Sequence, residues 1–145
     1  MKHQNIHVTA IIGDAEIADS AVIGPYAIIY DGVRIGPGTE IGAGTIIYSK
    51  AVLGEKNKIY NNVTIHPDVE IGDENTILPY SSIGTLPQLS SLERQKGRDR
   101  LIIGHGNKIW EYVTISCGTE DHPTIIGNQT SLFSHAHIAH GCRLE

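Results

Sequence analysis

The 145-residue sequence has little aromatic content: one Phe, one Trp and six Tyr, so aliphatic side chains must fill any core. It has no run of about 18 apolar residues, which excludes a membrane-spanning helix. The first ten residues, MKHQNIHVTA, lack the apolar centre of a secretory signal. Two cysteines without such a signal fit a reducing compartment better than a disulfide framework, so a cytoplasmic location is expected. The net charge of -5 gives no electrostatic reason to expect nucleic acid binding.

Aliphatic residues recur at every sixth position through most of the chain. The series starts at Ile11 and runs unbroken to Ile83, and a small or slim β-branched residue follows each member by four positions. Cys142 belongs to this second, inward series and is expected in the core. A period of six fits β-strands, whose side chains alternate with period two, but not one face of an α-helix. Glycines after the aliphatic residue, such as Gly24, are expected at bends that need unusual backbone angles. The sequence therefore predicts an all-β protein, a parallel β-helix with coils about 4.8 Å apart.

The period is interrupted twice. Relative to a spacing of six, the first interruption adds 14 residues near 85–98 and the second adds five near 120–124. With both insertions set aside, aliphatic residues that flank them stack on one another, so both insertions leave from one corner of the coil. If the residues of the first interruption are divided differently between coil and insertion, the first insertion leaves from another corner. The stacked residues are Ile83, Ile115 and Ile138. The residues two positions after them, expected at the same corner, are Thr85, Cys117 and His140.

Three histidines, His135, His137 and His140, lie close together in the segment SHAHIAHGC. The period directs Ala136 and Ile138 inward, so His137 is expected to point outward and the other two histidines to lie at bends. One interpretation is a solvated polar rim. The other is a general base, because imidazole titrates near neutral pH and can accept a proton from a sugar hydroxyl or an amine.

The segment HAHIAHGC resembles NAHIAHDC-type segments of the UDP-N-acetylglucosamine O-acyltransferases, the first enzymes of lipid A biosynthesis. The run NKIWEYVTISCGT is similar to that family's N-x-I-R-E-x-V-T-I-H-R-G-T, and IGTLPQ is similar to its IG-x-P-P-Q loop. The resemblance covers essentially the whole chain. It implies a single-stranded left-handed parallel β-helix with about 18 residues per coil. It also implies acyl transfer from acyl carrier protein to a hydroxyl of a UDP-amino sugar, without a cofactor, at active sites between the subunits of a homotrimer.

The resemblance assigns roles to individual residues. His140, the second histidine of AHIAH, is expected to be the base on the sugar hydroxyl, and His137 to lie near the acyl donor and the substrate. Gln88 matches a glutamine of the family's loop. The backbone N–H of Gly141 is a candidate donor to the oxyanion that forms during attack on the thioester. Cys117, at the predicted corner, is a further candidate for the substrate site.

Several positions depart from the family's pattern. The family's Asp after the second histidine is Gly141 here, and the histidine of its VTI run is Ser116. The Asp and Lys of its loop fall at Leu89 and Ser91. These changes keep an acetyl-CoA-dependent sugar-nucleotide acetyltransferase as an alternative. The basic stretch Arg94–Arg100 is either a contact for a phosphate, for CoA or for an acidic carrier protein, or a solvated loop.

Two further classes fit the same fold. The spacing of His135 and His140 is similar to that of downstream zinc ligands in γ-type carbonic anhydrases, but the upstream ligand position is Ser116. The other class is a non-catalytic hexapeptide scaffold. Members of the acyltransferase family continue past AHIAH with further coils and a C-terminal helical region, which residues 1–145 lack. The chain, interpreted as one β-helix domain, is expected to be a truncated product or a short natural variant.

Overall fold

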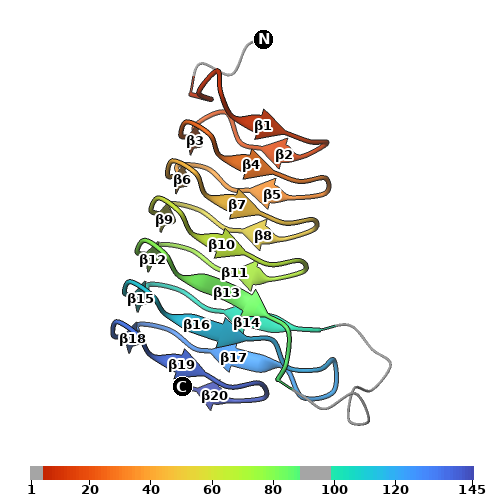
Figure 1. Ribbon diagram of the computed structural model, residues 1–145, viewed down its shortest axis with the longest axis vertical. Helices are drawn as coiled ribbons and strands as arrows, with labels where there is room; N and C mark the ends of the chain where they lie inside the picture. Colours follow the sequence, from red (N-terminus) through yellow and green to blue (C-terminus); the bar gives the residue numbers. More distant parts are fainter. Residues whose placement is uncertain (1–4, 89–98) are drawn as a thin grey trace.

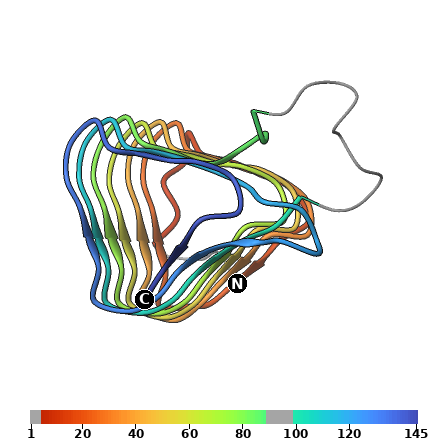
Figure 2. The same ribbon diagram turned by 90° about the horizontal axis from the view of Figure 1, so that it is seen from below.

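The computed structural model describes residues 5–88 and 99–145, which form a prism of short parallel strands (Figure 1). Successive strands belong to three different sheets, so each coil contributes one strand to each sheet. This is the parallel β-helix that the period predicts, of the left-handed kind that the resemblance implies. Seen along the prism, the strands of each sheet lie one behind another and the section is roughly triangular (Figure 2). Within the described ranges, no helix has the length and apolar character needed to cross a membrane.

The strands divide among three sheets, labelled I to III. Sheet I contains β1 (Ile11–Ile12), β4 (Ile28–Ile29), β7 (Ile46–Ile47), β10 (Thr64–Ile65), β13 (Ser82–Thr85), β16 (Thr114–Ser116) and β19 (His137–Ile138). Sheet II contains β2 (Glu16–Ile17), β5 (Arg34–Ile35), β8 (Val52–Leu53), β11 (Glu70–Ile71), β14 (Leu101–Ile103), β17 (Thr124–Ile126) and β20 (Arg143–Leu144). Sheet III contains β3 (Val22–Ile23), β6 (Glu40–Ile41), β9 (Lys58–Ile59), β12 (Thr76–Ile77), β15 (Lys108–Ile109) and β18 (Ser131–Leu132).

The core is a column of aliphatic side chains. In a two-residue strand such as β4, Ile28 faces outward and is half-buried, whereas Ile29 points inward and is 1% exposed. None of the eight aromatic side chains belongs to the buried core. The predicted aliphatic core is therefore confirmed. Cys142 differs from its prediction: it is exposed in the last coil of residues 1–145.

The start of the predicted series is wrong by one residue. Ile12, not Ile11, stacks on Ile29 and faces the interior, while Ile11 pairs with Ile28 and is 64% exposed. The step from Ile12 to Ile17 is one residue shorter than the later steps. Because side chains alternate along a strand, a shift of one residue turns Ile11 to the outside.

The glycines after the core aliphatics also have a different role from the one predicted. Except at Gly84, the left-handed backbone angles occur two residues later, at positions that many side chains occupy, such as Tyr26 and Lys50. Gly36 is not among the residues with positive φ. A Cβ at Gly36 would lie 2.5 Å from the carbonyl oxygen of Gly54 in the next coil. Close stacking of successive coils, rather than backbone conformation, therefore requires glycine there.

Candidate active site

Both long connections leave the prism at the corner between sheets I and II (Figure 2). Ile83 pairs with Ile115, and Ile115 pairs with Ile138, which confirms the predicted stacking. Thr85 and Cys117 lie at one corner, as predicted, and the Cys117 N–H donates to the carbonyl oxygen of Thr85 at 2.8 Å. In the strand register, however, Thr85 is displaced and pairs with Ser116. The displacement follows from a bulge between Ile83 and Thr85, where Gly84 has a φ of 90°. The same corner therefore collects the ends of β13, β16 and β19.

His137 is exposed on the outer face of β19, as predicted. Its Nδ1 atom lies 2.7 Å from Oγ1 of Thr114, the residue paired with it in the neighbouring strand. This hydrogen bond holds one side of the ring and leaves Nε2 directed toward other partners. The fold therefore presents His137 with a fixed imidazole at the surface.

His140 lies in the turn after β19 and is partly buried. Its ring makes no hydrogen bond with the described residues, so its nitrogens are available to a substrate. The next residue, Gly141, has a φ of 71°. Its N–H donates to Oγ1 of Thr124 at 2.9 Å. This N–H already has a partner within the fold, and its role as a donor to an oxyanion stays a prediction.

Cys117 does not present its thiol to a substrate. The side chain is 2% exposed, and Sγ lies 3.4 Å from the carbonyl oxygen of Gly84. Burial and the negative charges of Asp99 and Asp68 raise the pKa of the Cys117 thiol to about 12. A thiol with that pKa stays protonated near neutral pH and is a poor nucleophile. The expectation of a substrate contact at Cys117 does not hold, because the residue packs inside the corner.

Ser116 is also buried, although it occupies the position of a histidine in the resemblance. It is fully covered, and its Oγ lies 3.1 Å from Oγ1 of Thr85. The hydroxyl pair joins the ends of β13 and β16. Ser116 therefore stabilises the corner without offering a group to solvent.

The first insertion is described only at its two ends. Gln88 is exposed at the end of the first described range. Leu89, Ser91 and most of the basic stretch Arg94–Arg100 lie outside the described residues. At the other end, Nη2 of Arg100 lies 3.6 Å from Oε1 of Glu70, so this one described cation of the stretch has a carboxylate neighbour.

His135 lies at a different corner from His140. It occupies the turn between β18 and β19, and its ring stacks on Tyr112 with centroids 5.0 Å apart. His140 follows the other end of β19. Across residues 5–88 and 99–145, no three histidine, cysteine or acidic side chains are grouped closely enough to hold a metal ion.

His66, Ser82 and Thr114 are polar residues of this face that the period of core aliphatics does not point to. His66 follows β10, and its Nε2 lies 3.0 Å from Oγ of Ser82 in β13. Burial lowers the pKa of His66. The sequence does contain a signal for such residues, namely the residue before each core aliphatic, because that position faces outward on every strand. Following it down sheet I leads through Ser82 and Thr114 to His137.

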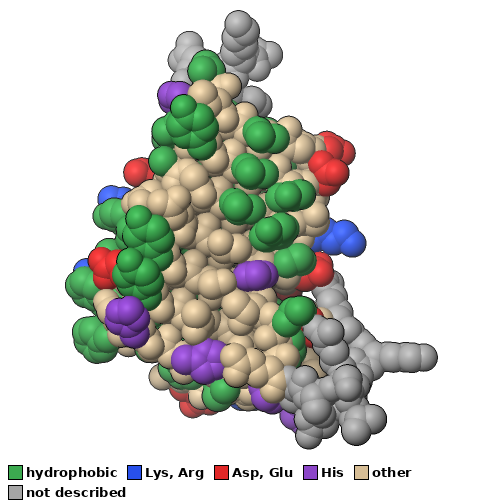
Figure 3. Space-filling view, in the orientation of Figure 1, with side chains coloured by type: hydrophobic (Ala, Val, Ile, Leu, Met, Phe, Trp, Pro, Cys, Tyr) green, Lys and Arg blue, Asp and Glu red, His purple; other side chains and the backbone are tan. Residues whose placement is uncertain are grey.

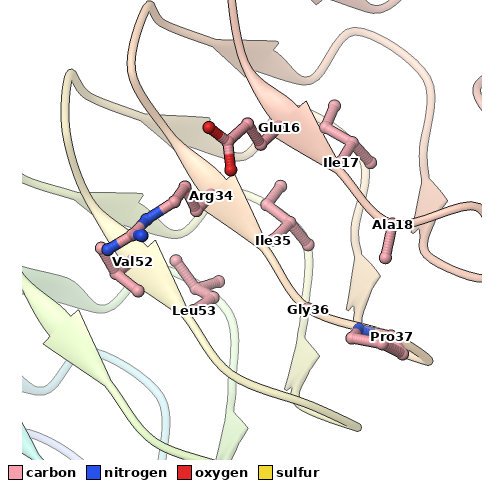
Figure 4. Close-up of a pocket in the computed structure, with 9 residues that line it drawn as sticks. All are labelled: Glu16, Ile17, Ala18, Arg34, Ile35, Gly36, Pro37, Val52 and Leu53. Carbon is pink, nitrogen blue, oxygen red and sulfur yellow. The ribbon is translucent and has the colours of Figure 1, made fainter.

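A separate hollow lies on the outer face of sheet II in the first coils. Residues of β2, β5 and β8 line it, and Figure 4 shows Glu16 and Arg34 extending from neighbouring strands. The candidate histidines belong to the last coils and do not line it. The surface beside His137 and His140 is therefore the better candidate for chemistry.

Comparison with known proteins finds relatives that align with nearly the whole chain. Two relatives are named acyl-[acyl-carrier-protein]–UDP-N-acetylglucosamine O-acyltransferase. The protein of Thermodesulfovibrio yellowstonii is 37% identical, with 96% of this chain and 47% of that protein aligned. The protein of Rickettsia canadensis is 35% identical, with 99% and 48% aligned. The crystal structure of the UDP-N-acetylglucosamine O-acyltransferase of Moraxella catarrhalis superposes with a TM-score of 0.64 at 38% identity, over 97% of this chain and 48% of that one.

The chain spans about half the length of the curated relatives that it matches. Residues 10–49 and 50–85 match the family described as bacterial transferase hexapeptide (six repeats). These ranges contain the unbroken part of the period of six, and each coil in them supplies one strand to each sheet. The chain therefore belongs to the bacterial transferase hexapeptide family.

Proposed function

We propose that the chain catalyses acyl transfer from an acyl carrier protein thioester to a hydroxyl of a UDP-N-acetylglucosamine-type sugar. The observation that carries the proposal is the presentation of His137 and His140 by one strand and its turn, at the corner where both long connections leave. A relative that is 37% identical over 96% of this chain is named for that reaction.

In the proposed mechanism, His140 is the general base. A ring nitrogen accepts the proton of the sugar hydroxyl while the hydroxyl oxygen attacks the thioester carbonyl carbon. The new C–O bond forms, the C–S bond of the tetrahedral intermediate breaks, and the imidazolium returns the proton to the departing thiolate. His137 contacts the donor or the sugar through Nε2, because Thr114 occupies its Nδ1 side. Gln88 is proposed as a contact from the insertion.

We further propose that the protein works as a homotrimer. The outer face of sheet I supports this proposal. The strands of sheet I contain no Asp, Glu, Lys or Arg, whereas strands of the other two sheets do. Hydrophobic side chains gather on the upper part of this face (Figure 3). Ile11 is 64% exposed and Tyr30 is 42% exposed there. An apolar area of this kind favours burial against another subunit, which would also exclude water from the neighbouring histidines.

The alternative donor is acetyl-CoA. Gly141 leaves His140 without the adjacent carboxylate that the resemblance would supply, so the polar surroundings of the base differ from that pattern. A direct comparison of the two acyl donors, rather than the presence of Gly141, decides which donor the protein uses.

The test is product formation from UDP-N-acetylglucosamine with purified protein, followed by mass spectrometry. Acyl carrier protein loaded with a hydroxyacyl chain is compared with acetyl-CoA at equal concentration. An O-acylated sugar nucleotide formed from acyl carrier protein supports the proposal. Product from acetyl-CoA alone replaces the donor in it, and no product from either donor contradicts acyl transfer to this acceptor.

A further inference from the structure

Outward residues on the lower half of sheet I form one polar column. Thr64, Ser82, Thr114 and His137 occupy the first position of successive strands and pair with one another in register. In the strands above Thr64, the same outward position is occupied by isoleucines, of which Ile46 pairs with Thr64. The outer face therefore changes from apolar to polar at Thr64. Histidine side chains lie on its lower part, below the hydrophobic ones, and charged groups lie toward its edges (Figure 3).

A second imidazole belongs to this polar half. Nε2 of His66 lies 3.0 Å from Oγ of Ser82, within the range of a good hydrogen bond. The His66 ring stacks on Tyr48 at 5.8 Å, and Tyr48 stacks on Tyr30 at 5.0 Å. The ring is thus held by Ser82 on one side and by an aromatic row on the other. This support resembles that of His137, which bonds to the hydroxyl of Thr114.

The side chains of the polar half suit an uncharged part of a ligand that is rich in hydroxyl groups, such as a sugar ring. Burial lowers the pKa of His66, so its ring is neutral near pH 7 and offers one donor and one acceptor. The hydroxyls of Ser82 and Thr114 can each donate and accept. Three strand spacings separate Thr64 from His137, about 14 Å at 4.8 Å per spacing. That length exceeds one sugar ring, so the column can contact an acceptor beyond the reacting hydroxyl.

We propose that His66 and Ser82 form a second part of the acceptor site, binding hydroxyl groups of a sugar-containing acceptor two strands and more away from His140. The inference rests on the proposed function for the reaction but concerns binding. His66 and Ser82 are contacts that set affinity and specificity, whereas His140 moves the proton. The two roles predict different kinetic effects, since a binding contact alters KM and a base alters kcat.

The experiment observes the imidazole resonances of the full 145-residue chain by NMR during titration with UDP-N-acetylglucosamine. His66→Gln assigns the His66 resonance. His105, in a turn of sheet II beside Asp73, serves as the control imidazole outside the face. We expect the His66 resonance to shift with ligand and the His105 resonance to stay unchanged. A His66 resonance that does not move while other resonances show binding overturns the inference.

Kinetics provide the second measurement. We expect His66→Gln and Ser82→Ala each to raise KM for UDP-N-acetylglucosamine about fivefold, with kcat changed less than about twofold, as the loss of a hydrogen bond predicts. His105→Gln should leave both constants unchanged. Unchanged KM in both variants with normal acyl transfer refutes this inference and leaves the proposed function intact. Binding of the sugar nucleotide at His66 without acyl transfer supports this inference and contradicts the proposed function. If His66→Gln fails to fold, the KM of Ser82→Ala still decides.

Discussion

Nδ1 of His137 lies 2.7 Å from Oγ1 of Thr114, across the neighbouring strands β19 and β16. The two residues are paired in register, so the stacking of coils, rather than a loop, positions the imidazole. A threonine one coil away thus fixes the ring of a candidate site residue. In the proposed mechanism, Thr114 acts through His137 and is a positioning residue.

Replacing Thr114 by Val should lower kcat/KM for acyl transfer about fivefold, because it removes one hydrogen bond and keeps the β-branched shape. The far-UV spectrum and the unfolding midpoint should stay close to wild type. Thr76→Val is the matched control, because Thr76 holds the same strand position on sheet III. Equal effects of the two substitutions would show that the Thr114 hydroxyl has no special role.

Gly141→Asp should raise kcat about tenfold by placing a carboxylate beside His140, the gain expected for a hydrogen bond with a charged partner. The turn accepts the side chain: Asp68 occupies the corresponding position after β10 with a φ of 59°. The one atom within 4 Å of a Cβ at Gly141 is the carbonyl oxygen of His122, at 3.8 Å. Gly141→Asn has the same shape without the charge. If both variants change kcat equally, a charge effect on His140 is ruled out.

Stability should fall at acid pH because of His66. Burial lowers its pKa in the folded state, whereas the unfolded imidazole titrates near 6.5. Both states are neutral at higher pH, so the full stability is present above about pH 6.5. As the pH falls below that value, the unfolded state binds the proton first and the folded state loses stability until its own pKa is reached. Urea midpoints at about pH 8 and about pH 5 should differ more in wild type than in His66→Gln. Identical pH dependence in the two proteins would contradict the assignment.

Gly36→Ala should destabilise the fold by about 3 kcal/mol, because the added methyl meets the backbone of the next coil. Gly106 provides the contrast: it has a φ of 65°, and the nearest atom to a Cβ there is 3.6 Å away. Gly106→Ala should cost about 1 kcal/mol from backbone conformation alone. Denaturant unfolding of both variants measures the difference. A larger loss for Gly106→Ala would mean that conformation, not coil spacing, governs these glycines.

The period of six was sufficient to predict a parallel β-helix and the convergence of the two insertions, whereas the left-handed sense came from the family resemblance. Each coil repeats the same inward pattern, so counting residues predicts that Ile115 stacks on Ile83 without knowledge of the coordinates. The outward direction of His137 follows from the same count. Such a pattern predicts neighbours well because coils stack in register.

The sequence was less informative where the register shifts locally. The short first step turns Ile11 outward, and the bulge at Gly84 moves Thr85 opposite Ser116. The same corner covers Cys117, which the count places only at a bend. The pairing of His66 with Ser82 depends on side-chain directions in two different coils, and the spacing of core residues carries no information about it.

The central claim is that His140 removes the proton from the acceptor, and the rate of acyl transfer by His140→Ala tests it most directly. We compare it with wild type and with His135→Ala, whose imidazole lies at another corner. Loss of a general base should lower kcat about 100-fold or more, while His135→Ala should stay within about twofold of wild type. A His140→Ala protein that transfers the acyl group at the wild-type rate would contradict the account.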